Sequence, residues 1–334
     1  MKWYPWLRPS FEQLVGSYQA GRGHHALLLQ SLNGMGGEAL IYALRRSLML
    51  RQPEGHISCG HRHSCQLLQA GTHPDYYALS PEKGKSALGI DAVRDVNEKL
   101  YEHARLGGAK VVWISDAALL TDAAANALLK TLEEPPENTW FFLACEEPAR
   151  LLTTLRSRCR LHHQAPPSEP YALAWLEREV SLPQESLLTA LRLCASAPAA
   201  ALELLQEPLW TARHQLCQAL AATLASGDWL ALLPILNHEQ AAVRLHWLAS
   251  LLVDAQKRQQ GITLVSNPDV WPLLEQLAHS LPAARLQAIA HDVCTCREQL
   301  LNVVGVNREL LLTERLLRWE HYLQPGTVLP VSHL

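Results

Sequence analysis

Short apolar runs alternate with stretches of helical periodicity in the first half of the chain. Five runs have the length and the flanking turn residues of buried strands, and they span 25–29, 76–79, 111–114, 140–144 and 160–163. The helices predicted between them span 38–49, 90–103 and 122–132, and Asp91 is expected to be an N-cap. Strands that alternate with helices in this way predict an α/β domain, with a parallel sheet and helices on both faces.

The second half of the chain carries helical periodicity almost to its end. Two prolines in segment 165–168 mark a linker, because neither neighbouring element can continue through them. Three short helices are predicted over 170–206, and longer ones over 239–260, 282–303 and 307–322. We therefore predict three domains, which are an α/β domain over 1–165 with an insert at 50–65, a small helical domain over 166–207 and an all-α domain over 208–334.

Composition limits the classes of protein that this sequence can encode. The 334 residues are 48% hydrophobic and 18% charged, enough to bury several cores, and the net charge of -3 predicts no strongly basic face. No apolar run reaches the ~18 residues of a membrane span, and the first ten residues lack an apolar leader. The 8 cysteines are scattered, as is typical of reduced thiols, so we expect a cytoplasmic protein without a membrane partner.

A glycine-rich turn follows the first predicted strand at the place where P-loop proteins bind phosphate. Its glycines are Gly34, Gly36 and Gly37, and a helix is predicted to begin directly after them. A working loop of this kind needs Lys followed by Ser or Thr, but Gly37 and Glu38 occupy those two positions. On these residues alone, an ordinary turn between strand and helix is the alternative interpretation.

The metal-binding acids of such an ATPase are expected after another strand of the sheet. The run that ends at Ile114 is followed by Ser115 and Asp116, so only one carboxylate is present at this position. A polar strand end is the simpler interpretation of Asp116. Together with the glycine turn, it indicates an ATPase fold that has lost its catalytic groups.

One longer motif is more specific than these fragments. The string NALLKTLEEPP covers 126–136, and LRSRC follows over 155–159. This pair resembles the clamp-loader ATPases, a branch of the AAA+ superfamily, and HHALLLQ, THPDYY and KVVWISDA extend the likeness over essentially the whole chain. With its damaged phosphate loop, the chain is most similar to the delta prime branch of the bacterial DNA polymerase III clamp-loader family. The resemblance implies an AAA+-type domain, a lid domain and a helical C-terminal collar that joins subunits in a ring.

The resemblance also implies which functional residues are lost. In active members, the loop Lys and Thr correspond to Gly37 and Glu38, and the Asp-Glu pair of the third strand corresponds to Ser115 and Asp116. The two sensor residues of active members, a Thr and an Arg, correspond to Cys145 or Glu146 and to Ala199. The resemblance therefore implies a subunit with no bound nucleotide cofactor and no ATPase activity of its own.

One functional residue of the family is retained. Arg158, in the SRC triplet, aligns with an arginine that reaches the γ-phosphate bound by the adjacent subunit. Such an arginine finger acts in trans, so this chain would complete its neighbour's ATP site. The alternative for Arg158 is an ordinary surface ion pair. Arg156 either supports the same site or pairs with a local carboxylate.

The insert at 50–65 carries cysteines and histidines in a region where relatives hold zinc with four cysteines. Only Cys59 and Cys65 match those ligands, and the two other positions are Leu50 and Arg62. Two interpretations stay open. A structural zinc would need two further ligands from His56, His61 and His63, because mixed Cys/His sites are common, or else the segment is a loop held by local packing.

The partners implied by the resemblance are the ATP-binding gamma/tau subunits, the clamp-opening delta subunit and other polymerase III subunits. Primed DNA and the sliding clamp would be reached through that complex, in which the chain is an accessory of a DNA-directed DNA polymerase. Two other functions compete with this interpretation. An active ATPase motor is disfavoured by Gly37 and Glu38, and a zinc-stabilised DNA-binding protein by the net charge of -3 and the incomplete cysteine set.

Overall fold

The computed structural model describes residues 2–49, 63–81, 87–106, 108–324 and 326–329. The side chains of residues 63–65 lie outside that description. The chain forms two compact units, Met1–Pro167 and Ser168–Leu334. The expected linker prolines Pro166 and Pro167 end the first unit.

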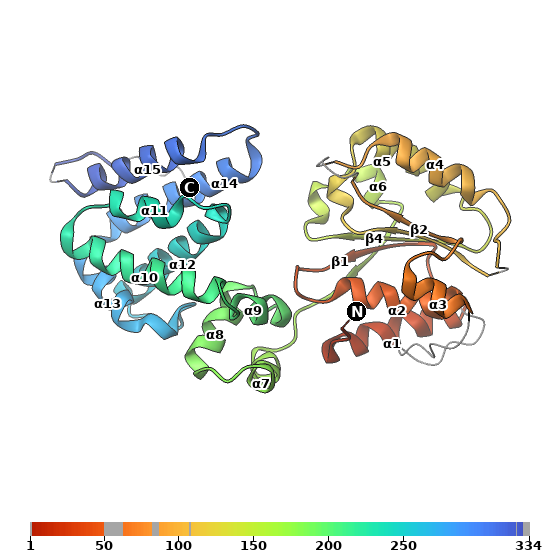
Figure 1. Ribbon diagram of the computed structural model, residues 1–334, viewed down its shortest axis with the longest axis horizontal. Helices are drawn as coiled ribbons and strands as arrows, with labels where there is room; N and C mark the ends of the chain where they lie inside the picture. Colours follow the sequence, from red (N-terminus) through yellow and green to blue (C-terminus); the bar gives the residue numbers. More distant parts are fainter. Residues whose placement is uncertain (1, 50–62, 82–86, 107, 325, 330–334) are drawn as a thin grey trace. The chain divides into compact units, whose positions relative to one another are not determined.

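The first unit is built on a five-stranded parallel sheet with the order β2-β3-β4-β1-β5 (Figure 1). All five predicted strands are confirmed, and no strand end differs from its prediction by more than one residue. In the register, Leu28 pairs with Leu143 on one side and with Leu161 on the other. The strands are β1 (Ala26–Gln30), β2 (Tyr76–Leu79), β3 (Lys110–Ile114), β4 (Thr139–Cys145) and β5 (Arg160–His163).

Helices cover both faces of this sheet, as the alternation of elements predicts (Figure 1). One face carries α1 (Arg8–Gln19), α2 (Gly37–Met49) and α3 (His63–Ala70). The other face carries α4 (Ile90–Leu100), α5 (Asp122–Glu133) and α6 (Thr153–Arg156). Short 3-10 turns complete the unit, namely η1 (Pro5–Leu7), η2 (Ala117–Leu119) and η3 (Pro148–Arg150).

Two local expectations were wrong. Gly89, not Asp91, is the N-cap of α4, because Leu88 bridges to Leu120 and this contact fixes where the helix can begin. Asp91 lies in the first helical turn, where its carboxylate interacts favourably with the helix dipole. Helix α1 is absent from the helices predicted above, and its Pro9 lies in the first helical turn, where proline is tolerated.

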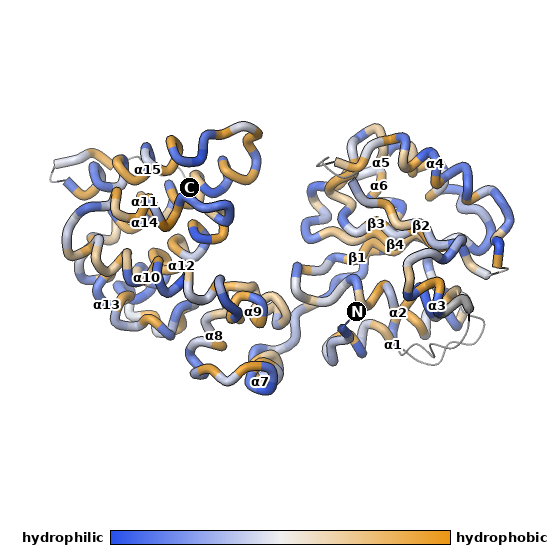
Figure 2. Tube along the Cα trace, in the orientation of Figure 1, coloured by the Kyte–Doolittle hydropathy of each residue, from blue (hydrophilic) through white to orange (hydrophobic). Residues whose placement is uncertain are grey.

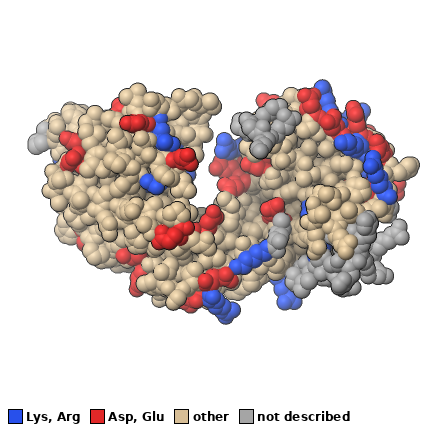
Figure 3. All heavy atoms as spheres, viewed as in Figure 1, with Lys and Arg blue, Asp and Glu red and all other residues tan. Residues whose placement is uncertain are grey.

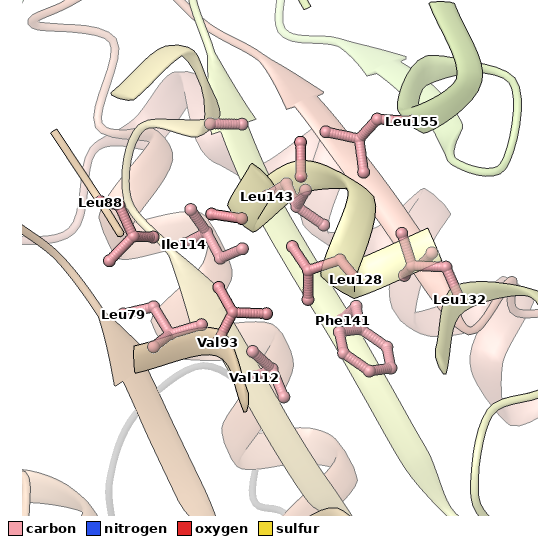
Figure 4. Close-up of a cluster of buried hydrophobic side chains, with 14 of the residues drawn as sticks. Leu79, Leu88, Val93, Val112, Ile114, Leu128, Leu132, Phe141, Leu143 and Leu155 are labelled. Carbon is pink, nitrogen blue, oxygen red and sulfur yellow. The ribbon is translucent and has the colours of Figure 1, made fainter. Parts of the chain in front are cut away.

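The core between the sheet and the second helical face is apolar (Figure 4). Val112, Phe141 and Leu143 of the strands lie against Val93 of α4 and Leu128 of α5, all almost fully buried. The hydropathy colouring shows the same strands as mainly hydrophobic segments (Figure 2). A sheet that is buried on both faces gives the continuous apolar runs seen in the sequence.

The second unit is helical throughout the part that the structure describes. The three short helices predicted over 170–206 are present as α7, α8 and α9, and three tryptophans, Trp229, Trp247 and Trp319, are buried in the core of the unit. In the described chain, no single helix is long and apolar enough to cross a membrane. The elements are α7 (Glu169–Glu179), α8 (Gln184–Leu193), α9 (Pro198–Leu204), α10 (Leu209–Ser226), η4 (Leu230–Leu232), α11 (Leu233–Leu236), α12 (Ala241–Gln259), η5 (Pro268–Val270), α13 (Trp271–Ser280), α14 (Ala283–Asn302) and α15 (Arg308–Leu323).

Candidate functional site

The glycine turn between β1 and α2 has the shape of a phosphate loop. Gly34 and Gly36 have a φ of +79° each, in the left-handed region that glycine adopts without strain. A Cβ on Gly36 would lie 2.5 Å from the Tyr4 ring, and a Cβ on Gly37 would lie 3.0 Å from Leu29. The space around these two glycines is therefore already filled by the chain's own side chains.

The N-terminal segment covers this turn. The indole nitrogen of Trp6 donates a buried hydrogen bond of 2.8 Å to the carbonyl of Met35, in the middle of the turn. The ring of Tyr4 stacks on Trp6 with 4.8 Å between centroids, and Leu7 is fully buried. An aromatic cover therefore fixes the backbone of the turn by packing and by one buried hydrogen bond.

A carboxylate of the same chain binds the turn. Glu146 follows β4, and its Oε1 accepts a hydrogen bond of 2.7 Å from the backbone N–H of Asn33. Cys145 beside it is buried, and burial raises the pKa of its thiol. Cys145 and Glu146 are the two residues expected at the first-sensor position. Cys145 is thus a buried thiol, and Glu146 places a negative charge at the turn. Glu38, exposed in the first turn of α2, adds a second negative charge.

The residues after β3 have a local role. The carboxylate of Asp116 accepts a hydrogen bond of 2.9 Å from the N–H of Ala118 and caps η2. Ser115 is exposed. In the second unit, the half-buried Ala199 of α9 offers only a methyl group at the second-sensor position. Ser115 and Ala199 thus offer no carboxylate or guanidinium group, and the carboxylate of Asp116 is used as a cap within the chain.

Arg158 lies between α6 and β5, at the opposite end of the sheet from the glycine turn. Its Nε donates to Glu133 Oε1 at 2.6 Å, its Nη2 donates to the same oxygen, and its Nη1 donates to the carbonyl of Thr154 at 2.8 Å. Both side chains of the ion pair are partly exposed, Arg158 at 31% and Glu133 at 49%. The structure thus joins the two most specific motifs of the sequence, NALLKTLEEPP and LRSRC, through one ion pair.

No local pattern in the sequence identifies Glu133 as the partner of Arg158. A signal was present, since Glu133 belongs to the same family motif, but only the fold shows that the end of α5 lies beside the residues after α6. Arg156 is exposed, and among the described residues it makes no side-chain hydrogen bond or ion pair. Cys159, next to Arg158, has a thiol whose pKa burial raises to about 11, so it is a neutral packing residue.

The expected zinc ligands cannot be placed. Cys59, His56 and His61 lie outside the described residues, as do the side chains of His63 and Cys65. In the part of the chain that is described, no group of three or more His, Cys, Asp and Glu side chains is arranged to hold a metal ion. The cysteines whose side chains are described are free thiols.

The distribution of charge agrees with the small net charge. On the face shown in Figure 3, acidic and basic side chains are interspersed and separated by uncharged areas. On α4, for example, Arg94 lies 4.0 Å from Asp91. No continuous basic surface is visible among the described residues on this face.

Three family models match the chain in sequence. Residues 7–168 match "DNA polymerase III, delta subunit", residues 167–206 match "DNA polymerase III subunit delta', AAA+ ATPase lid domain", and residues 207–321 match "DNA polymerase III, delta subunit, C terminal". Together the three matches extend from the first helix to the last. The match over residues 167–206 covers the three short helices and describes them as an AAA+ lid domain.

Full-length relatives give the same result. DNA polymerase III subunit delta' of Escherichia coli is 69% identical over 100% of both chains, and that of Yersinia pestis is 55% identical over 98% of both. DNA polymerase III subunit tau of Escherichia coli is 31% identical over 45% of this chain and 23% of its own. A solved gamma subunit-related protein of Thermotoga maritima has 18% identity and a TM-score of 0.49, over 93% of this chain and 98% of that one. A TM-score of 0.49 is too low to support a conclusion about this chain.

The expected AAA+-type domain, lid and helical C-terminal region are therefore present. The chain belongs to the DNA polymerase III subunit delta' family, the clamp-loader family that its LEEPP and SRC motifs indicated.

Proposed function

We propose that this chain is a non-catalytic clamp-loader subunit that supplies Arg158 to the ATP site of a neighbouring subunit. The single observation that carries this proposal is the contrast between Arg158 and the phosphate loop. The arginine is present and accessible, whereas the groups that would bind ATP in this chain are missing. In the cytoplasm, the assembled complex would load the sliding clamp onto primed DNA, and its ATP-binding neighbours would be gamma/tau subunits.

The ion pair of Arg158 supports this role. The Nε and Nη2 atoms of Arg158 both donate to one carboxylate oxygen of Glu133, and the same two parallel donors could instead contact two oxygens of a phosphate. Glu133 would thus hold the arginine extended until a neighbour's γ-phosphate competes for it. Exposed ion pairs contribute only about 0–1 kcal/mol, so the exchange costs little. An arginine finger in trans accelerates phosphoryl transfer by about 10³ or more.

The filled loop supports the absence of intrinsic ATPase activity. A phosphate at the turn would have to displace the Glu146 carboxylate from Asn33 and would meet Glu38 at the start of α2. No lysine side chain stands at position 37 to neutralise it. We therefore infer that the chain needs no nucleotide cofactor. Zinc in the 50–65 segment remains a separate proposal, to be decided by metal analysis of the wild type and of Cys59→Ser.

The C-terminal helices offer a surface for assembly. Leu312, Leu316 and Trp319 of α15 are fully buried in the second unit. Leu310 and Leu317, seven positions apart on the same helix, are 68% and 49% exposed. One face of α15 therefore belongs to the core and another is open, and we infer that the open face contacts the other collar domains, including that of delta.

The three-domain organisation, over 1–165, 166–207 and 208–334, is also part of this proposal. Inside the second unit, the lid helix α8 is tied to the C-terminal part, because Arg192 donates to the carbonyl of Val265 at 2.6 Å and Thr189 donates to Asp269 at 2.7 Å. Asp269 in turn pairs with the fully buried Arg213 at 2.5 Å. These contacts would let the lid and the collar move as one body in a ring.

The test is the ATP turnover of a reconstituted complex that contains Arg158→Ala. We expect the variant to fold and assemble, and DNA- and clamp-stimulated turnover to fall in part, because only the site that faces this subunit loses its finger. Arg158→Lys should not restore it, since a point charge cannot reproduce the planar fork. Arg156→Ala is the matched control and should be milder. Normal turnover and clamp loading with Arg158→Ala would leave the subunit with an architectural role alone.

A further inference from the structure

A surface pocket lies at the end of the sheet opposite the glycine turn. It is lined by Gln13 and Ser17 of α1, Arg22 and His24 of the loop before β1, and Arg160 and His162 of β5. In a parallel sheet, residues that precede β1 and residues that begin β5 lie at the amino ends of the strands. The phosphate loop follows β1 and lies at the carboxyl ends. The pocket is therefore distinct from the degenerate nucleotide site.

Its lining is basic. Two arginines and two histidines converge on it from three elements, and none of its lining residues is an Asp or a Glu. In the described part of the chain, neither Arg22 nor Arg160 forms an ion pair or a side-chain hydrogen bond, whereas Arg158, two residues before Arg160, is occupied by Glu133. Two uncompensated guanidinium groups at one pocket attract an anion.

One polar atom at the pocket lacks a partner. The Nε2 atom of His162 is buried and has no hydrogen-bond acceptor or donor among the described atoms. A buried polar atom of this kind costs free energy unless a ligand or a water satisfies it. His162 belongs to β5, the edge strand of the sheet, and its side chain is part of the pocket lining. Tyr18, by contrast, is committed to the chain itself, because its hydroxyl donates to the carbonyl of His24 at 3.2 Å.

We propose that this pocket binds a phosphate group, held by Arg22, Arg160 and His162. The guanidinium groups supply charge and paired N–H donors, the imidazole supplies one further N–H, and the Ser17 hydroxyl completes a set of donors that is typical of phosphate contacts. The same chemistry serves a free phosphate or a phosphodiester of a DNA backbone. This site goes beyond the role proposed for Arg158 and does not depend on it, because it acts in the isolated chain.

The test uses the isolated full-length chain and two probes, inorganic phosphate and a short fluorescently labelled single-stranded DNA. We expect at least one of them to bind and to shift the NMR signals of the His162 ring. Arg22→Ala and Arg160→Ala should each weaken that binding about tenfold or more, because each removes charged hydrogen bonds to the ligand. Arg156→Ala, an exposed arginine that does not line the pocket, is the matched control and should bind as the wild type does.

The two probes separate the sources of the phosphate. Binding of inorganic phosphate that DNA does not match indicates a free anion, whereas tighter, salt-sensitive binding of DNA indicates the backbone. Either result supports the site if both arginine variants weaken it. Absence of binding by both probes overturns the proposal, and so does binding that Arg22→Ala and Arg160→Ala leave unchanged. Thermal unfolding of each variant verifies that the loss is not a loss of fold.

Discussion

The two ends of the parallel sheet hold their polar groups in different ways. At the carboxyl ends, the glycine turn is covered by Tyr4 and Trp6 and bound by Glu146, so its hydrogen bonds are used inside the chain. At the amino ends, Arg158 is held by a partly exposed ion pair. Buried packing is costly to undo, whereas an exposed ion pair exchanges readily with another anion.

In the proposed function, the nucleotide site is closed in two ways, because its space is filled by side chains of the chain itself and because catalytic residues are missing. Restoring one residue to such a site should therefore fail, because the space and the donors are already occupied. The amino end of the sheet keeps a cation that is available to a partner. Four changes test whether the two ends differ in this way.

The largest effect is expected for the cover of the turn. Trp6→Ala removes a buried indole and its hydrogen bond to Met35, and should lower the free energy of unfolding by about 3–5 kcal/mol. Trp6→Phe keeps most of the packing and should cost much less. Urea unfolding of the isolated chain measures both. A loss below about 1 kcal/mol for Trp6→Ala would show that the cover is only loosely attached.

A lysine at position 37 should destabilise the chain without creating an ATP site. The Gly37 Cβ would lie 3.0 Å from Leu29 and 3.1 Å from the hydroxyl of Ser31, so a side chain there crowds the turn and should cost about 1–3 kcal/mol. Equilibrium binding of a fluorescent ATP analogue should stay undetectable. Adding Glu146→Ala, which frees the Asn33 amide, should not change this, because Ser115 and Ala199 still lack the groups that active members use. Magnesium-dependent binding by either variant would contradict the filled-site explanation.

A smaller effect is expected from pH at the amino ends of the strands. Burial lowers the pKa of His25 from its ordinary value of 6.5, and its Nε2 lies 2.7 Å from the carbonyl of Leu132, next to Glu133. The unfolded chain then binds the proton more readily than the folded one. The stability that neutral His25 contributes is thus complete above pH 6.5 and is lost as the pH falls from 6.5 through the lower, folded pKa.

Thermal unfolding at neutral and at mildly acidic pH checks this sign. The wild type should lose stability on acidification, and His25→Gln should lose less, because glutamine does not titrate. His162 and His246, whose pKa values burial also lowers, remain in both proteins and give the common background. An identical loss in wild type and variant would remove His25 from this explanation.

The smallest effect on stability is expected for Arg158 itself. Arg158→Ala breaks an exposed ion pair and should change the free energy of unfolding by less than about 1 kcal/mol. Glu133→Gln should have an equally small effect. Urea midpoints of the isolated chain compare them directly. A much larger loss would mean that the pair is a structural element, and would weaken the case for an exchangeable finger.

Much of the fold followed from the sequence because its physical signals are local. Buried strands with both faces covered give unbroken apolar runs, so all five strands were found within one residue of their ends. The double proline at 166–167 marked the boundary between the two units for a local reason too, since neither neighbouring element continues through two prolines. The order of the motifs around Gly34–Gly37 and Ser157–Cys159 was enough to indicate the family.

Other features depended on contacts between distant segments. The N-cap of α4 is fixed by the bridge from Leu88 to Leu120, which no local preference at Asp91 reveals.

The partners of the functional residues were decided in the same way. Glu133 and Arg158 are 25 residues apart in sequence, and Asn33 and Glu146 are 113 apart. Arg22 and Arg160, which are separated by almost the whole sequence of the α/β unit, line one pocket. The absence of a Lys-Ser/Thr pair after the glycine turn and the presence of Arg158 are evident from the residue types alone. The groups that cover the glycine turn and that bind Arg158 became visible only in the fold, because hydrogen bonds and ion pairs depend on distances that chain order does not contain.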